Sequence, residues 1–305
     1  MIQTIIHITL LALLPPLLLG IIDKTKAWFA GRRGAPVLQP YFELWKLARK
    51  GAVYSRTTSW VFRAGPVVVL GTALTAGAVV PLHAGAAPLG FGGDVVVFAY
   101  LLGLGRFFTM AAALDTGSSF EGMGASREAA FSALAEPALF LALCVLCVPA
   151  ASPSFSDAWR AMPSGLGLAY RPELLAAALA IFAVLLTECS RVPVDDPNTH
   201  LELTMVHEVM VLDHSGPDLA FILYGSAVKL LLLSSLLVHI LLPIPDAGGV
   251  VGAALFCAGA IGVAVLIGVV ESGMARFRLE RVPQLLVGAA VLGALGLLVA
   301  LGGRR

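Results

Sequence analysis

Residues 188–216 are the part of this chain best suited to chemistry, because carboxylates and histidines crowd there between two apolar segments. The ionisable side chains of this segment are Glu188, Arg191, Asp195, Asp196, His200, Glu202, His207, Glu208, Asp213 and His214. A charged side chain in a bilayer costs about 2.5–3.5 kcal/mol on insertion scales, so such clusters usually move protons or ions, or contact a partner. The segments around the cluster must decide between these roles.

Two local patterns in this segment have simpler interpretations. His200, His207 and His214 recur every seven residues, which would place them on one face of a continuous helix. Thr199 and Glu202 fit a capping box, which would explain Glu202 as a helix cap rather than a proton carrier. The segment 207–211 ends in valine, so it is no H-E-x-x-H zinc pair, and we predict no metal site.

Four further ionisable residues interrupt otherwise apolar stretches: Arg106, Glu136, Lys229 and Glu271. Lys229 lies near the middle of the apolar run 221–242, too deep to reach water easily, so it needs a carboxylate or water. We expect Glu136 to be its counterpart. A lysine and carboxylates spaced through a bundle can relay protons, because the pKa of each responds to its neighbour's charge. The alternative is a static ion pair that fixes helix register.

The composition identifies the class of protein that holds these groups. Of 305 residues, 58% are hydrophobic and 13% charged, and the mean hydropathy is +0.90, which excludes an ordinary soluble domain. A membrane span needs about 20 apolar residues. Eight stretches qualify: 2–22, 61–82, 94–114, 127–150, 172–190, 218–243, 248–270 and 283–303. We therefore predict one all-α, polytopic membrane domain of about eight transmembrane helices with structured cytoplasmic loops.

The basic residues predict the orientation of this bundle. Nine of the 20 lysines and arginines follow the first apolar stretch, between residues 24 and 63, whereas residues 83–93 contain none. Basic loops stay in the cytoplasm, so both termini should lie on the outer side of the inner membrane. The net charge of +1 gives no reason to expect a nucleic-acid partner, and the basic first loop can face anionic lipid.

Two other loops on the predicted inner side are unusually elaborate. Residues 31–40 contain glycine turns and two prolines, and residues 41–50 alternate apolar and basic side chains, which indicates a short amphipathic helix at the interface or on the surface. Residues 115–128 are rich in glycine, serine and carboxylates, so they form either a packed loop or a flexible linker.

Together, the segments 31–50, 115–128 and 188–216 resemble the membrane subunit shared by energy-converting [NiFe] hydrogenases and respiratory complex I, the NADH dehydrogenase subunit 1 family. The likeness covers nearly the whole chain, with its motifs in the family's order. Gly-Ser-Ser-Phe-Glu-Gly-Met-Gly-Ala-Ser-Arg-Glu and Val-Asp-Asp-Pro-Asn-Thr-His-Leu-Glu-Leu-Thr-Met are most similar to the hydrogenase-4 and formate hydrogenlyase members.

The resemblance implies a membrane anchor that performs no redox chemistry itself. It would join a soluble arm, with the [NiFe] large subunit and a small iron–sulfur subunit, to antiporter-like proton-pumping subunits. Cys144 and Cys147 form a C-x-x-C, but they lie within the apolar run 139–148, where cysteine behaves as a small buried hydrophobe. Cys189 and Cys257 have no partner at metal-ligand spacing. The [NiFe] centre and the iron–sulfur clusters should therefore belong to the partners, and this chain should hold no cofactor.

The resemblance also suggests roles for individual residues. The expected proton-coupling residues are Glu136, Lys229, Glu188, Asp195, Glu202, Glu208 and Asp213. The expected contacts with the soluble arm are Arg32, Arg33, Gln39, Glu121, Arg127, Arg191, Asp196 and His200.

The main alternative is the quinone-site subunit of a complex I type NADH:quinone oxidoreductase, because residues of this subunit line the quinone tunnel in complex I. Residues 34–40 lack the longer Gly-Pro-Asn-Arg-type insertion of quinone-using relatives, so we predict no tightly bound quinone. Two further alternatives are a passive membrane anchor and a stand-alone cation/proton transporter.

Overall fold

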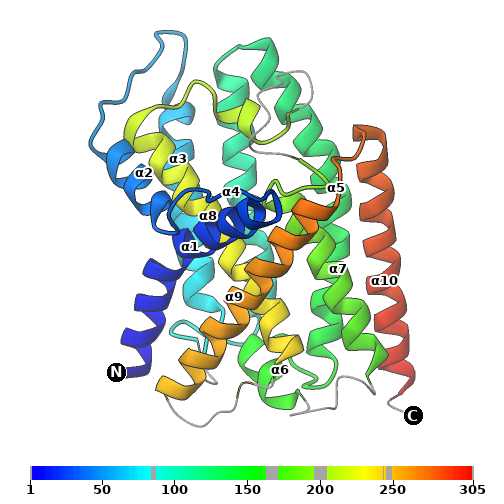
Figure 1. The fold of residues 1–305 in the computed structure, drawn as a ribbon. Coiled ribbons are helices and arrows are strands. Elements are labelled where there is room, and N and C mark those ends of the chain that lie inside the picture. Colours follow the sequence, from blue (N-terminus) through cyan, green and yellow to red (C-terminus); the bar gives the residue numbers. More distant parts are fainter. Residues whose placement is uncertain are drawn as a thin grey trace.

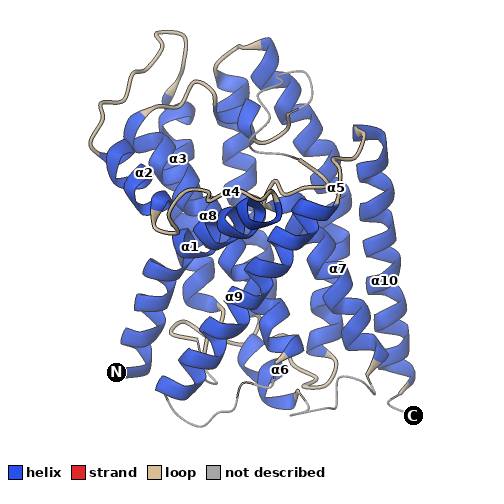
Figure 2. Cartoon of the chain, in the orientation of Figure 1, coloured by secondary structure: helices blue, strands red, loops and turns tan. Residues whose placement is uncertain are grey.

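The structure is a computed structural model that describes residues 2–83, 87–162, 171–195, 205–242, 244 and 249–303. Every regular element in these ranges is a helix (Figure 2), which confirms the predicted all-α class. The elements are α1 (Ile2–Phe29), α2 (Gln39–Ala48), α3 (Trp60–Val79), α4 (Asp94–Asp115), α5 (Ser119–Cys147), α6 (Phe155–Ala161), α7 (Pro172–Glu188), η2 (Glu208–Val211), α8 (Gly216–Leu241), α9 (Val250–Gly273), η3 (Leu279–Arg281) and α10 (Val282–Gly302).

Each of the eight predicted apolar stretches coincides with a helix. Among the described residues, seven helices are long and apolar enough to cross a membrane, namely α1, α3, α4, α5, α8, α9 and the segment Leu279–Gly302 that contains α10. The remaining helix, α7, is equally apolar but has 17 residues. The two ends of the chain lie at the same end of the bundle (Figure 1), as an even number of crossings requires.

Helix α8 forms the centre of the bundle. Of its most apolar 18-residue window, 72% is buried, whereas the corresponding share is 22% for the segment with α10. Helices α1, α2, α3, α7 and α9 all pack against α8, while α10 packs at the edge against α5 and α7. A charged residue on α8 is therefore placed in the interior of the protein.

Proline and side-chain caps fix where several helices begin. α2, α7, α8 and α10 each have a proline in their first two positions, where its missing N–H costs nothing. At α3, the Ser59 hydroxyl accepts a hydrogen bond from Val61 N–H. Asp115, at the end of α4, accepts hydrogen bonds from the N–H groups of Ser59 (2.6 Å) and Phe62 (3.3 Å). The end of α4 thus fixes the start of α3.

The first helix is longer than expected. α1 continues to Phe29 rather than ending near residue 22, and it contains Pro15 and Pro16. Interior prolines remove helical hydrogen bonds and bend the axis, and the two halves of α1 run in different directions in Figure 1. The predicted amphipathic helix is confirmed as α2, in which no residue is buried and Phe42 and Trp45 are exposed.

Residues 115–128, expected to be a loop or linker, are largely the first turns of α5, which begins at Ser119. Their small residues allow a close approach to the segment that contains η2. A Cβ at Gly124 would lie 2.4 Å from Cγ1 of Val209 and 3.0 Å from the carbonyl oxygen of Val206. The glycine serves helix packing here rather than flexibility.

The expected continuous helix through the three histidines is wrong for the described part. His207 precedes the single turn of η2, and His214 lies in an irregular stretch before α8. Asp195 Oδ2 accepts hydrogen bonds from the N–H groups of Val206 (3.1 Å) and His207 (3.3 Å), which holds the backbone in a turn. His200 and the Thr199–Glu202 pattern lie outside the described residues.

Candidate functional site

Arg106, on α4, collects three carboxylates in the interior of the bundle. Its Nη1 lies 2.6 Å from Oε1 of Glu136 and its Nη2 lies 2.5 Å from Oε1 of Glu188. Its Nε lies 3.4 Å from Oε1 of Glu128. The guanidinium side chain is 5% exposed, so these contacts replace water as its surroundings. Because arginine stays charged in proteins, Arg106 is a fixed positive charge shared by α4, α5 and α7.

Lys229, on α8, has a different partner from the one expected. Its Nζ lies 3.4 Å from Oε2 of Glu188, and the same carboxylate contacts Arg106 through its other oxygen. Glu136 lies on the far side of Arg106, so the predicted direct pair of Lys229 with Glu136 is wrong. The reason is helix packing: Glu188 ends α7, which packs against α8, whereas Glu136 is on α5 and faces α4.

From Glu128, the contacts continue toward the end of the bundle opposite the termini. His207 Nε2 lies 3.1 Å from Oε2 of Glu128, and His207 Nδ1 lies 3.7 Å from Oδ2 of Asp195. Asp195 Oδ1 in turn accepts a hydrogen bond from Nη2 of Arg276 at 2.8 Å. We call this connected set the ion chain: Glu136, Arg106, Glu188, Lys229, Glu128, His207, Asp195 and Arg276.

His207 decides the charge of the ion chain. Burial lowers the pKa of His207, but the carboxylates of Glu128 and Asp195 outweigh burial and raise it to about 9. Burial raises the pKa of Asp195, and the hydrogen bonds and charge of His207, together with Arg276, bring it below its usual range. At formal charges, the four carboxylates of the ion chain exceed the basic groups Arg106, Lys229 and Arg276 by one, so a protonated His207 makes the set neutral.

A second buried group of charges lies beside the ion chain. Glu271, on α9, is held by Lys26 Nζ at 2.8 Å and by Arg191 Nη1 at 3.5 Å, and its side chain is fully buried. These contacts tie α1 and the end of α7 to α9. The sequence identifies Glu271 as unusual, but only packing shows its partners.

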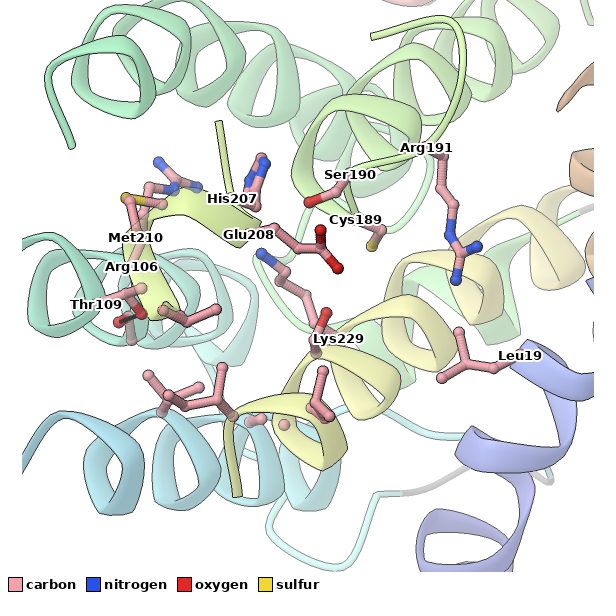
Figure 3. Close-up of a pocket in the computed structure, with 18 of the residues that line it drawn as sticks. Leu19, Arg106, Thr109, Cys189, Ser190, Arg191, His207, Glu208, Met210 and Lys229 are labelled. Atoms are coloured by element: carbon pink, nitrogen blue, oxygen red, sulfur yellow. Dashed lines mark hydrogen bonds between the residues drawn. The ribbon is translucent and has the colours of Figure 1, made fainter. Parts of the chain in front are cut away.

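A cavity of about 350 Å³ adjoins both groups (Figure 3). Figure 3 shows Lys229 and Glu208 extending into the same space, with Arg106 and Arg191 on opposite sides of it. The remaining wall is largely apolar and comes from α1, α2, α3, α4 and α8; it includes Leu19, Leu44, Val69, Leu102 and Ile222. The cavity can therefore hold an amphiphilic molecule or water next to the ion chain.

The predicted coupling residues fall into three groups. Glu136, Glu188, Asp195 and Lys229 belong to the ion chain, and Glu208 lines the cavity. Asp213 is exposed, and within the described ranges no ion pair joins its carboxylate to the ion chain. Glu202 lies outside the described residues, as do Asp196 and His200, which were expected to contact the soluble arm.

Two of the expected arm contacts are internal instead. Glu121 is 1% exposed, and its Oε1 accepts a hydrogen bond from Asp213 N–H at 3.1 Å. Arg191 is 7% exposed and contacts Glu271. The contacts of both residues therefore lie inside the chain. Arg127 donates to the Met205 carbonyl at 2.9 Å, whereas Arg32 and Arg33 are exposed and Gln39 is half-buried.

Sequence reasoning missed four members of the ion chain as site residues: Arg106, Glu128, His207 and Arg276. Arg106 alone carried a clear signal, since an arginine inside an apolar span needs carboxylate partners. In the part of the chain that the structure describes, no three His, Cys, Asp or Glu side chains are grouped as metal ligands.

The family of the chain follows from comparison with known proteins. A family model described as NADH dehydrogenase matches residues 2–302. The chain belongs to the NADH dehydrogenase family. This confirms the resemblance inferred from the three polar segments.

Two Escherichia coli K12 proteins are similar to this NADH dehydrogenase family member. Formate hydrogenlyase subunit 4 is 33% identical over 279 residues, covering 88% of this chain and 89% of that protein. Hydrogenase-4 component C is 34% identical over 236 residues, covering 77% and 73%. A chain of the archaeal membrane-bound sulfane sulfur reductase, a respiratory membrane complex, has a TM-score of 0.83 at 20% identity over 98% of both chains, which shows the shared fold. The protein is a membrane subunit of this complex I-like class.

Proposed function

We propose that this chain is the membrane anchor and coupling subunit of an energy-converting [NiFe] hydrogenase. It would hold the soluble hydrogenase arm at the cytoplasmic face of the inner membrane and link it to antiporter-like proton-pumping subunits. The similarity to formate hydrogenlyase subunit 4 and hydrogenase-4 component C supports the hydrogenase class. The observation that carries the proposal is the ion chain, which runs from Arg276 and Asp195 near one end of the bundle to Glu136 within a candidate membrane span.

The ion chain can transmit a change of charge through the protein although the protein performs no redox chemistry itself. A change of charge in the arm would alter how firmly His207 holds its proton between Asp195 and Glu128. Arg106 cannot pass a proton on, since arginine does not deprotonate in proteins. The three carboxylates around it can respond electrostatically, because neutralising one of them removes its repulsion of the other two. A change in the charge of Glu128 would therefore act on Glu136, which contacts the same guanidinium.

The exposure of Glu136 supports the proposal of a partner subunit in the membrane. Its side chain is 49% exposed although it lies in the apolar helix α5, and a carboxylate is not stable facing lipid tails. On neighbouring α4, Tyr100 is 69% exposed and Phe107 is 58% exposed. A second membrane subunit over this face would cover the aromatic rings and give the Glu136 proton a route onward, which fits an antiporter-like partner.

Coupling is tested on the purified complex in sealed vesicles. Glu136→Gln and Lys229→Met should leave hydrogen evolution from an artificial soluble donor nearly intact but abolish the membrane potential that it generates. Asp157→Asn, an exposed change on α6, is the matched control and should leave both unchanged. A normal potential in both assembled variants would favour the passive anchor. If neither variant assembles, Glu136→Asp is used instead, because it keeps the carboxylate and changes only its position. The same membrane potential is then measured.

The cavity supports a second candidate, the quinone-site subunit of a complex I type enzyme. Its apolar wall and adjacent cations would suit a quinone ring that accepts protons on reduction. Solvent extraction of the purified complex and chromatography separate the two candidates. We expect no stoichiometric quinone; a quinone whose reduction depends on this subunit would replace the hydrogenase proposal.

A further inference from the structure

The loop between α9 and α10 forms a basic groove, of which the coupling proposal uses Arg276 alone. The groove is open, has a volume of about 470 Å³ and is lined by Met274, Ala275, Arg276, Phe277, Arg278 and Arg281. Three of these six residues are arginines. The single carboxylate of the loop, Glu280, does not line the groove. The groove is therefore a concentrated positive surface.

The backbone of the loop is fixed, so the arginines are held in place. Phe277 N–H donates to the Pro193 carbonyl at 2.8 Å, and the Phe277 and Leu279 side chains pack against the apolar core. Arg281 N–H donates to the Arg278 carbonyl at 2.8 Å, which closes a turn between them. Both arginines are exposed, and among the described residues neither makes an ion pair. A ligand could bind them without a loss of internal contacts.

The position of the groove selects the kind of ligand. α10 begins directly after Arg281 and exposes an apolar ridge of Val287, Val291, Leu295 and Leu298, which are 49–67% exposed. In a membrane, such a ridge contacts acyl chains, so the groove at its end lies at headgroup depth. The N-terminus of a 21-residue helix also favours negative charge there.

We propose that this groove binds the phosphate of an anionic phospholipid, with Arg278 and Arg281 as its ligands and the acyl chains along α10. Guanidinium groups bind phosphate oxygens in bidentate fashion, and basic pockets at helix ends recognise such headgroups. Arg276 lines the same groove while its Nη2 contacts Asp195 at 2.8 Å. A bound phosphate would compete with Asp195 for Arg276, so lipid occupancy would act directly on one end of the ion chain.

The test is native mass spectrometry of the purified complex released from nanodiscs of phosphatidylcholine mixed with cardiolipin. Wild-type complex should retain cardiolipin. Arg278→Gln/Arg281→Gln should retain it about 25-fold less well, since each basic side chain at an anionic surface contributes roughly fivefold. Lys46→Gln/Lys50→Gln removes two exposed charges that lie outside the groove and should reduce retention much less. Arg278→Lys/Arg281→Lys should be intermediate, because it keeps charge but loses the bidentate geometry.

Three outcomes would overturn the proposal. Equal retention in wild type and the Gln variant excludes the groove as the site. Equal loss in the Gln variant and the Lys46/Lys50 control means that only total charge matters. Inorganic phosphate that displaces cardiolipin at comparable concentration identifies a free phosphate site instead of a lipid site.

Discussion

Nε2 of His207 lies 3.1 Å from Oε2 of Glu128, and this contact joins the segment after α7 to α5. The same imidazole lies 3.7 Å from Asp195 through Nδ1. His207 is thus the point at which charges near the end of the bundle meet those around Arg106. Its pKa, about 9, allows a change of charge within a few pH units of neutrality.

The first prediction concerns pH. The pKa of His207 is raised from 6.5 to about 9 in the folded protein, so its stabilising contribution is complete below pH 6.5. That contribution should fall as pH rises through about 9. Thermal unfolding of the purified complex should show this loss of stability in the wild type. The His207→Gln variant should be less stable than the wild type below pH 6.5, and its stability should change less between pH 6.5 and about 9. Parallel profiles of thermal stability against pH in the wild type and the variant would contradict the raised pKa of His207.

The second prediction concerns Arg106. Arg106→Met leaves Glu128, Glu136 and Glu188 without their shared cation and should destabilise the protein by about 3–5 kcal/mol, the usual cost of breaking a buried pair. Arg106→Lys should cost less, because it keeps the charge but not the fork of donors. Arg160→Met, at an exposed ion pair, is the control and should change stability by less than about 1 kcal/mol. Denaturation in detergent measures all three; similar losses in the two Met variants would mean that Arg106 is not an organising residue.

The third prediction concerns Gly216, at the start of α8. Its φ is +58°, and a Cβ there would lie 2.6 Å from the carbonyl oxygen of Gly51. Gly216→Ala should therefore cost roughly 1–3 kcal/mol of strain and loosen the contact between the first loop and α8. Gly51→Ala, which meets nothing within 4 Å, should be nearly neutral. Thermal unfolding and hydrogen exchange of residues 50–54 check both, and equal protection in the two variants would show that the close approach is not needed.

The fourth prediction concerns the docking surface. A photo-crosslinking residue at Arg32, Arg33 or Asp213, all exposed and in loops predicted to face the cytoplasm, should form adducts with the hydrogenase subunits. The same residue at exposed Asp157 on α6, which is predicted to face the outer side, should not. Predominant adducts from position 157 would reverse the proposed orientation.

The membrane class, the positions of the apolar helices and the family could be predicted from the sequence. Each depends on local information: a span is a run of apolar residues, and the family shows in short motifs such as those within residues 115–128 and 188–216. Glu136, Glu188, Asp195 and Lys229 were also identifiable, because an ionisable residue in or beside an apolar run is unusual by itself.

Which charges meet was decided only by the tertiary structure. Lys229 pairs with Glu188 because α7 packs against α8, and Glu136 pairs with Arg106 because α5 faces α4. Likewise, Glu121 and Arg191 are polar residues in polar segments, and only tertiary packing buries them, Glu121 beside Asp213 and Arg191 beside Glu271 of α9. Hydropathy records how apolar each helix is but not which helices are neighbours, and an ion pair between helices depends on that arrangement.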